Sequence, residues 1–136
     1  MSKAMEKIIS PIKNEINIFE QELKKIILTE DNFLCKDLYE FIFTNPKRLR
    51  PILIFLLSKV LKIENNNVLK IALATELIHN ASLIHDDIID EEETRRNIRT
   101  FHNKFNSKIA VLEGDLLLSF ALDILSDTSL EILKIF

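Results

Sequence analysis

Polar side chains lie along one face of an apolar helical segment between residues 76 and 93. At about 100° per residue, Asp90 lies about 40° from Asp86 on a helical wheel, and Ser82 lies about 40° away on the other side. His79 falls between Asp86 and Asp90 on the same wheel. The spacing therefore predicts one continuous polar stripe on this helix, formed by His79, Ser82, Asp86 and Asp90.

Negative charge is concentrated at the end of this stripe. Asp and Glu occupy six of the eight positions from 86 to 93, including Asp87 at the shoulder of the stripe. Carboxylates four residues apart repel each other, and the negative end of the helix dipole adds to that repulsion. Oxygen ligands without cysteine select a hard cation, and Mg²⁺ binds through one or two carboxylates together with substrate phosphates. The pattern is therefore consistent with a Mg²⁺ site.

A solvated acidic helix end is the alternative interpretation of these charges. The apolar neighbours Ala81 to Ile84 and Ile88–Ile89 favour a buried helix, and buried carboxylates require a partner. An EF-hand loop is excluded because the segment lacks alternating oxygen ligands and the glycine at the sixth position. A di-iron bundle needs two Glu-x-x-His motifs, and Glu76 to His79 supplies only one. Zinc would require cysteines or clustered histidines, which the segment lacks.

Two basic clusters flank the acidic segment. Lys47, Arg48 and Arg50 precede a predicted helix that begins near Pro51, and a helix N-terminus with adjacent cations is suited to an anion. The second cluster, Arg95–Arg96, directly follows the acidic run. Each cluster alone is compatible with ordinary surface charge. Beside a metal site, however, they form the set that a diphosphate requires, because the metal bridges the phosphates while Arg and Lys bind the outer oxygens.

Helices must position these residues. Apolar side chains recur every three or four positions along most of the chain. The predicted helices cover residues 6–28, 33–43, 51–63, 68–93 and 107 to the end of the chain. The segment 29–32 is predicted as a break, and 95–106 as a polar loop with little regular structure. Leu130, Leu133 and Phe136 keep the helical periodicity to the last residue with no Gly, Asn or Pro stop signal there, so the chain is expected to end within this helix or just after it.

The composition favours an all-α protein expected in the cytoplasm. The chain has 136 residues with one Gly and three Pro, too few turn formers for a sandwich, a barrel or a Gly-rich nucleotide loop. Its net charge of −3 argues against a dedicated nucleic-acid binder. The single cysteine, Cys35, forms no internal disulfide and fits a reducing cytosol. No stretch approaches the ~20 apolar residues of a membrane span, and residues 1–15 lack the apolar core of a signal peptide.

Four motifs resemble those of the trans-type polyprenyl diphosphate synthases. They are Asn-Pro-Lys-Arg-Leu-Arg-Pro (45–51), Leu-Ile-His-Asn-Ala-Ser-Leu-Ile-His-Asp-Asp-Ile-Ile-Asp (77–90), Arg-Arg (95–96) and Val-Leu-Glu-Gly-Asp (111–115), in the order and spacing of that family. The resemblance covers essentially the whole chain, but only the N-terminal half of such an enzyme. It implies an all-α isoprenoid-synthase helical bundle, in which residues 1–136 are the N-terminal helices of a single domain.

The resemblance also implies a role for each site residue. Asp86 and Asp90 correspond to the first aspartate-rich motif, which binds Mg²⁺ and through it the allylic diphosphate, and Asp87 belongs to the same motif. Arg95 would contact the allylic diphosphate. Isopentenyl diphosphate would be held by Lys47, Arg50, His79 and Arg96. The implied reaction ionises the allylic diphosphate, adds the isopentenyl double bond to the carbocation and releases a proton.

The sequence departs from the family in three places. Pro46 stands where the family usually has Gly, and Asn97-Ile98-Arg99 stands where it has Gly-x-Pro. Both changes lie in loops that the resemblance puts beside the diphosphates. The second aspartate-rich motif of the family has no counterpart, so the chain as written is expected to be catalytically incomplete.

The sequence is compatible with more than one product length and with more than one role for the chain. Ala81 and Ser82 lie about one turn before Asp86, where short-chain members often carry a bulky aromatic residue, and small residues leave room for a longer product. They resemble the medium- to long-chain synthases, and a farnesyl or geranylgeranyl diphosphate synthase is the alternative. Members of the family are typically homodimers. A non-catalytic subunit that binds and regulates a complete synthase, or an unrelated Mg²⁺-phosphate-binding module, are the other possibilities.

Overall fold

The structure of the chain is a computed structural model that describes residues 3–28, 33–63 and 65–136. Most of it is helical, which confirms the all-α prediction. In chain order the elements are α1 (Lys3–Ile9), the 3₁₀ helix η1 (Ser10–Ile12), α2 (Lys13–Ile27), α3 (Phe33–Phe43), α4 (Leu49–Val60), α5 (Asn67–Ile89), β1 (Thr94–Arg95), β2 (Ile98–Arg99), α6 (Phe101–Lys104), α7 (Ser107–Ser126) and α8 (Leu130–Leu133). The break predicted at 29–32 lies outside the described residues. Among the described helices, none combines the length and the apolar character that a membrane crossing requires.

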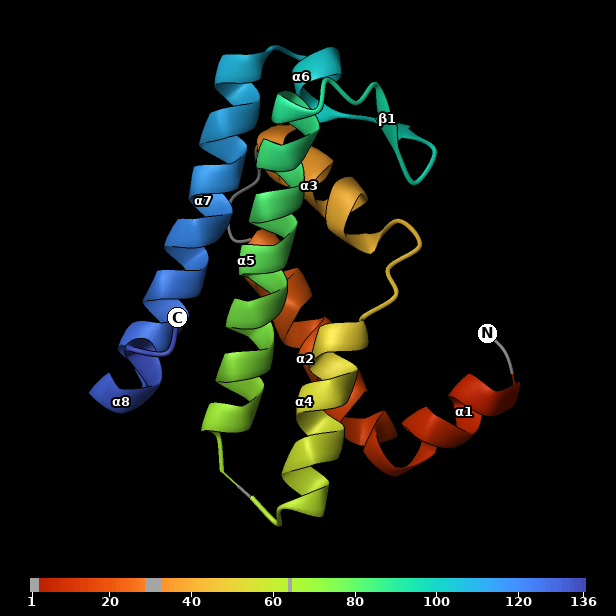
Figure 1. The fold of residues 1–136 in the computed structure, drawn as a ribbon, viewed down its shortest axis with the longest axis vertical. Helices are drawn as coiled ribbons and strands as arrows, with labels where there is room; N and C mark the ends of the chain where they lie inside the picture. The colour runs from red at the N-terminus through yellow and green to blue at the C-terminus, as the bar shows by residue number, and fades with distance from the viewer. Residues whose placement is uncertain (1–2, 29–32, 64) are drawn as a thin grey trace.

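Two long helices, α5 and α7, form the centre of the structure. They run antiparallel and side by side in Figure 1, and no two other elements pack against each other as extensively. Helix α4 flanks α5 and is also antiparallel to it (Figure 1). The β1–β2 hairpin and α6 lie at the upper end of α5. The hairpin, the α3–α4 loop and α4 therefore all lie on the side of α5 that faces away from α7.

Apolar side chains of the helices form one core. Phe19, Leu23 and Ile27 of α2 are fully buried at four-residue spacing, as the periodicity predicts. The ring of Phe19 meets the ring of Phe55 in an edge-to-face contact with 6.2 Å between centroids, which joins α2 to α4. Burial of each such side chain contributes about 1.5–3 kcal/mol. These contacts hold α2 beside α4, so that Glu20 of α2 comes close to the start of α4.

The helix predicted over 6–28 is divided in the structure. The 3₁₀ turn Ser10–Ile12 separates α1 from α2, because Pro11 has no N–H to donate within a continuous α-helix. Figure 1 shows α1, which precedes this turn, extending away from the body of the molecule. By contrast, the prediction over 33–43 is confirmed by α3.

The helix predicted from 107 to the end of the chain is too long. Helix α7 ends at Ser126, and α8 begins after Ser129. The Thr128 hydroxyl donates to a carbonyl in the last turn of α7 at 2.6 Å. The Ser129 hydroxyl accepts a hydrogen bond from the Ile132 amide at 3.3 Å and caps α8. Such side-chain hydrogen bonds end one helix and begin another without any Gly or Pro.

A β-hairpin occupies part of the segment that the sequence predicts as irregular. Helix α5 ends at Ile89 rather than at residue 93, because Glu91 adopts a left-handed conformation with φ of 54°. Strands β1 and β2 pair antiparallel around Arg96 and Asn97, whose φ values are 51° and 68°. Two central residues with positive φ are typical of a type I′ turn, in which Asn is favoured. The two arginines of the second basic cluster therefore lie on an ordered hairpin.

Gly114 allows α5 and α7 to approach closely. The ring of His85 lies against it, and a Cβ added at Gly114 would lie 2.2 Å from His85 Nε2. The same nitrogen lies 3.3 Å from the Val111 carbonyl oxygen and 3.6 Å from Asp115 Oδ1. A glycine within a helix costs about 1 kcal/mol relative to alanine. Here that cost is offset because any larger residue would displace the His85 ring.

We expect Gly114→Ala to stabilise the fold less in the wild type than in a His85→Ala background. In the wild type the new methyl group forces the partly exposed His85 ring to move, which offsets part or all of the gain of up to about 1 kcal/mol from a better helix former. In the His85→Ala background nothing opposes that gain, so it should appear in full. Urea denaturation of the four proteins measures both effects. Equal effects in both backgrounds would contradict the close approach.

Glu113, beside Gly114, is a buried carboxyl group. Its side chain is 1% exposed, and within the described part of the chain its Oε2 has no hydrogen-bond partner. Burial, with a smaller contribution from the nearby Asp37 carboxylate, raises the pKa of Glu113 to about 7. Burying an ionised carboxylate is costly, so the folded chain keeps Glu113 protonated below neutral pH.

Glu113 is expected to make the stability of the fold decrease as the pH rises. Its folded pKa of about 7 lies above the ordinary value of 4.5, so the contribution is complete below pH 4.5 and is lost as the pH rises through 7. The whole effect is on the order of 3 kcal/mol. Urea denaturation at about pH 5 and about pH 8 should show a smaller loss for Glu113→Gln than for the wild type. Glu131→Gln, at an exposed glutamate, is the control and should behave as the wild type; equal losses in all three proteins would refute the assignment.

Candidate functional site

A cavity of about 500 Å³ opens beside α5. It is formed by the loop before α4, the middle of α5 and the β1–β2 hairpin. Its lining includes the residues that the resemblance assigns to direct contact with a diphosphate, which are Lys47, Arg50, His79, Arg95 and Arg96. The aspartates of the metal motif, Asp86, Asp87 and Asp90, are not among the lining residues. Three separate stretches of the chain therefore build one basic cavity.

His79 is a neutral group in this basic cavity. Burial lowers the pKa of His79, and the charge of the nearby Arg50 guanidinium lowers it further. Burial also lowers the pKa of Arg96, whose Nη1 donates to the Thr44 carbonyl at 3.5 Å. Arginine remains charged at neutral pH because its ordinary pKa is far above 7. The positive charge of the cavity is therefore carried by Lys and Arg, with His79 as a neutral hydrogen-bonding group among them.

Arg95 is held at the edge of the cavity by Asp87. Its Nε donates to both Asp87 carboxylate oxygens, at 2.7 and 3.0 Å, and its Nη2 donates to Oδ1 at 2.5 Å. Asp87 is 2% exposed. The Asp87 carboxylate, through these hydrogen bonds, raises the pKa of the Arg95 guanidinium. Asp87, which the resemblance includes in the metal-binding motif, is thus paired with Arg95, and the pair fastens the hairpin to the end of α5.

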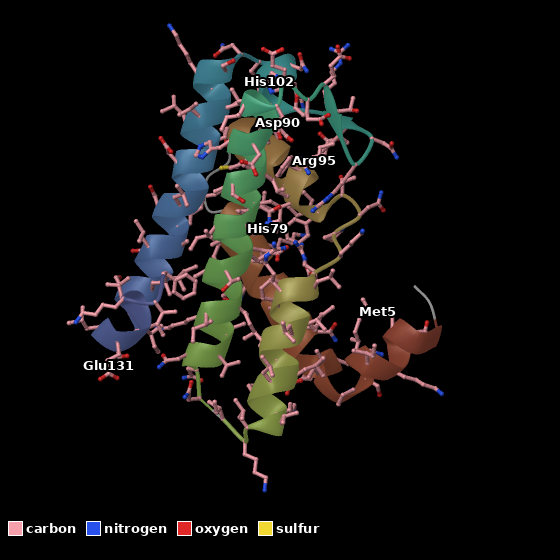
Figure 2. All side chains as sticks on the ribbon, in the orientation of Figure 1. Met5, His79, Asp90, Arg95, His102 and Glu131 are labelled. Atoms are coloured by element: carbon pink, nitrogen blue, oxygen red, sulfur yellow. The ribbon has the colours of Figure 1, made fainter. Side chains whose placement is uncertain are left out.

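Asp86 and Asp90 lie one helical turn apart at the end of α5, and both are exposed. Figure 2 shows Asp90 and Arg95 near the upper end of α5 and His79 further down the same helix. The prediction that this stretch is buried is wrong for these two aspartates, because the buried Ile84 belongs to another face of the helix. In the ranges 3–28, 33–63 and 65–136, no group of three or more His, Cys, Asp or Glu side chains is arranged to hold a metal ion.

The two residues predicted for the product pocket lie in different environments. Ala81 is fully buried in the core. Ser82 is exposed, and its hydroxyl donates to the His79 carbonyl at 2.8 Å. Of the two, only Ser82 shares the exposed face of α5 with Asp86.

Three charged residues of the site were not predictable as a group. Arg48 Nη1 donates to Glu76 Oε1 at 2.9 Å, while Arg48 Nε and Nη2 donate to the two oxygens of Glu20 at 2.7 and 3.1 Å. Arg48 and Glu76 also line the cavity. Each glutamate is 28 residues from Arg48, far beyond the range of helical periodicity. The one available signal is Glu76 itself, a charged residue on an apolar helix, one turn before His79.

The comparison with known families agrees with the motifs that line this cavity. The model of the polyprenyl synthetase family matches residues 32–136. The chain belongs to the polyprenyl synthetase family. The matched region contains the basic loop, the aspartates of α5, the hairpin and α7, so it includes the site residues described above except Glu20 of α2.

Individual members of the polyprenyl synthetase family match most of the chain. A prenyl transferase of Cyanophora paradoxa is 37% identical over 133 residues, which cover 94% of this chain and 41% of that protein. A geranylgeranyl pyrophosphate synthase of Geoglobus acetivorans is 32% identical over 116 residues, covering 85% and 36%. The crystal structure of a polyprenyl synthase from Caulobacter crescentus, complexed with calcium and isoprenyl diphosphate, matches with a TM-score of 0.86 at 26% identity, covering 96% and 40%. The helical fold of the family is therefore confirmed, and the chain spans roughly two fifths of the length of these relatives.

The Asp87–Arg95 pair is expected to stabilise the end of α5. Arg95→Met would leave a buried carboxylate without its partner and should cost on the order of 2 kcal/mol, less than for a fully enclosed pair because Arg95 is 28% exposed. Combining it with Asp87→Leu should recover most of the loss, because an apolar pair leaves no buried charge. Urea denaturation of the wild type, the two single variants and the double variant measures this coupling. Strictly additive losses would show that the two side chains do not depend on each other.

Proposed function

We propose that the chain forms the diphosphate-binding half of a Mg²⁺-dependent prenyltransferase, which condenses an allylic diphosphate with isopentenyl diphosphate. One observation carries the proposal: Lys47, Arg50, Arg95 and Arg96 line one cavity beside α5, the helix that also presents two exposed aspartates. A diphosphate carries several negative charges on outer oxygens that Arg and Lys bind well. Family membership supports the same reading.

The basic residues divide between two substrates in this proposal. Isopentenyl diphosphate is held by Lys47, Arg50, His79 and Arg96. His79 is neutral, so it binds a phosphate oxygen by donating a hydrogen bond and adds no positive charge. Arg95, which lines the cavity and is paired with Asp87 near the end of α5, contacts the allylic diphosphate and stabilises the charge on the departing group. Asp87 keeps the Arg95 guanidinium in place for this contact.

The aspartates of α5 fit a Mg²⁺ ion shared with a substrate. Asp86 and Asp90 are exposed and one turn apart, and Mg²⁺ is usually bound by one or two carboxylates together with substrate phosphates. When bound, Mg²⁺ would neutralise the charge that develops on the diphosphate as the bond between its oxygen and the allylic carbon breaks. The isopentenyl double bond attacks the allylic carbon, and the new product loses a proton. Leu49 and Leu83 contribute an apolar part of the cavity wall, which keeps water away from the reacting carbon.

We propose a medium- to long-chain all-trans product. The support is the small Ser82 side chain, which leaves space on the exposed face of α5 below Asp86. Ala81 adds no support, because its side chain is enclosed by the core. A short-chain product is the alternative, and the relative from Geoglobus acetivorans bears the name of a geranylgeranyl pyrophosphate synthase.

A homodimer in the cytoplasm completes the proposal. Leu49, Leu53 and Leu57 form an exposed apolar stripe at four-residue spacing along α4, which is surface available for burial in an assembly. Cys35 is buried and belongs to no disulfide in the structure, as expected in a reducing compartment.

A prenyl-transfer assay on the full-length protein tests the proposed function. With labelled isopentenyl diphosphate and an allylic diphosphate, product should form with Mg²⁺ and not after chelation. Asp86→Asn should lower kcat by about 100-fold or more, because it removes a carboxylate that acts on the departing charge. The control is Asp123→Asn, at an exposed aspartate of α7 outside the cavity. Diphosphate binding without any turnover would instead favour a non-catalytic subunit of a complete synthase.

A further inference from the structure

Arg48 differs from its basic neighbours in its surroundings. Lys47 and Arg50 are exposed, whereas Arg48 is 6% exposed. Its guanidinium makes the hydrogen bonds to Glu20 and Glu76 described above. Two aromatic rings also face it, with its Cζ 5.9 Å from the ring centre of Phe19 and 5.0 Å from that of Phe43. One side chain therefore contacts α2, the end of α3 and α5.

The backbone of Arg48 is equally constrained. Its φ of 49° lies in the left-handed region, which costs a non-glycine residue about 1–2 kcal/mol. Its carbonyl accepts the Ile52 amide at 3.0 Å and so begins α4. Strain of this kind persists only where the surroundings hold the residue in place, and it is concentrated at functional sites. Here the carboxylates of Glu20 and Glu76 hold Arg48 in this conformation. Arg48 lies between Lys47 and Arg50 in the sequence, so the strained residue is within the basic loop.

The charge balance shows that this cluster does not attract anions. One guanidinium faces two carboxylates, so Glu20, Arg48 and Glu76 together carry a net charge of −1. Such a group on the wall of a diphosphate cavity repels its ligand. Buried ion clusters are also weak sources of stability, since apolar residues of similar volume can replace them. Neither attraction of an anion nor stabilisation of the fold accounts for the cluster. Its remaining contribution is to fix the position of the loop that contains Arg48.

We propose that Glu20, Arg48 and Glu76 form a positioning triad for the diphosphate cavity. Arg48 fixes the turn that places Lys47 and Arg50 at the cavity, and Glu76 anchors that turn to α5 one helical turn from His79. The triad therefore sets the spacing between the basic loop and the helix that carries His79 and the two exposed aspartates. This inference rests on the proposed function, because it assigns the triad to the same diphosphate site.

A substitution at Arg48 that keeps its charge distinguishes a positioning role from a purely electrostatic one. Calorimetric titration of the full-length protein with inorganic pyrophosphate at low salt gives the dissociation constant. Arg48→Lys keeps the charge but cannot reach both carboxylates with a planar fork, and we expect binding to weaken about tenfold. Charge alone predicts no change. Pyrophosphate bound by Arg48→Lys as tightly as by the wild type would overturn the triad.

A second variant keeps the test valid if Arg48→Lys does not fold. Replacing Glu20, Arg48 and Glu76 together by Met removes two negative charges and one positive charge, which makes the cavity more positive by one unit. An apolar triad should retain the folded state, which a thermal melt checks. Charge alone predicts tighter pyrophosphate binding, whereas positioning predicts weaker binding, again about tenfold. Tighter binding by the folded triple variant would overturn the inference.

Two further variants and one control separate this inference from the proposed function. Lys47→Gln and Arg50→Gln each remove a charge from the cavity itself, and Lys108→Gln removes an exposed charge outside it. Weaker binding in the first two but not in the third supports the diphosphate cavity, and the Arg48 variants then decide the triad alone. If Lys47→Gln and Arg50→Gln bind pyrophosphate as the wild type does, the proposed function fails and the triad fails with it.

Discussion

The buried guanidinium of Arg48 imposes the constraint on which the cavity depends. A buried charge persists only where partners match it, and here the two partners come from different helices, Glu20 of α2 and Glu76 of α5. Because Arg48 also begins α4, these three helices cannot shift relative to one another without leaving a charge unpaired. The apolar contact between Phe19 and Phe55 supports the same arrangement from the core. The position of the basic loop is therefore decided by an ion cluster and a core that surround it.

Helix α5 combines two tasks on different faces. Leu77, Ala81 and Ile84 are enclosed by the core, while Asp86 and Asp90 remain exposed. Two buried acids, Glu76 and Asp87, lie between these faces, and each holds one arginine from another part of the chain. The helix thus brings the basic loop and the hairpin to one side of itself. Close packing with α7 through Gly114 and His85 fixes the opposite side.

The sequence was sufficient to predict where most helices lie and which residues line the cavity. It was not sufficient to predict which side chains are buried or which charged residues pair across the fold. Periodicity located α3 and the buried face of α2, because both follow from local spacing. The motifs identified the residues that line the cavity, since their order carries family information that no helical wheel contains. The burial of Asp86 and Asp90 was wrongly predicted, because an apolar composition does not say which face meets a neighbour. The Arg48 cluster was missed for a related reason: its pairing spans 28 residues on either side and depends on how helices pack.

Adjacent arginines on the hairpin have separate attachments. Arg95 is bound to Asp87 of α5, while Arg96 in the turn reaches the Thr44 carbonyl before α4. This division depends on the number of residues between the end of α5 and the turn, because a shift of one residue reverses the direction of every side chain on a strand. Surface loops ordinarily accept insertions and deletions. In this loop an insertion or deletion would separate Arg95 from Asp87 or Arg96 from Thr44, so the two hydrogen-bonded attachments fix the number of its residues.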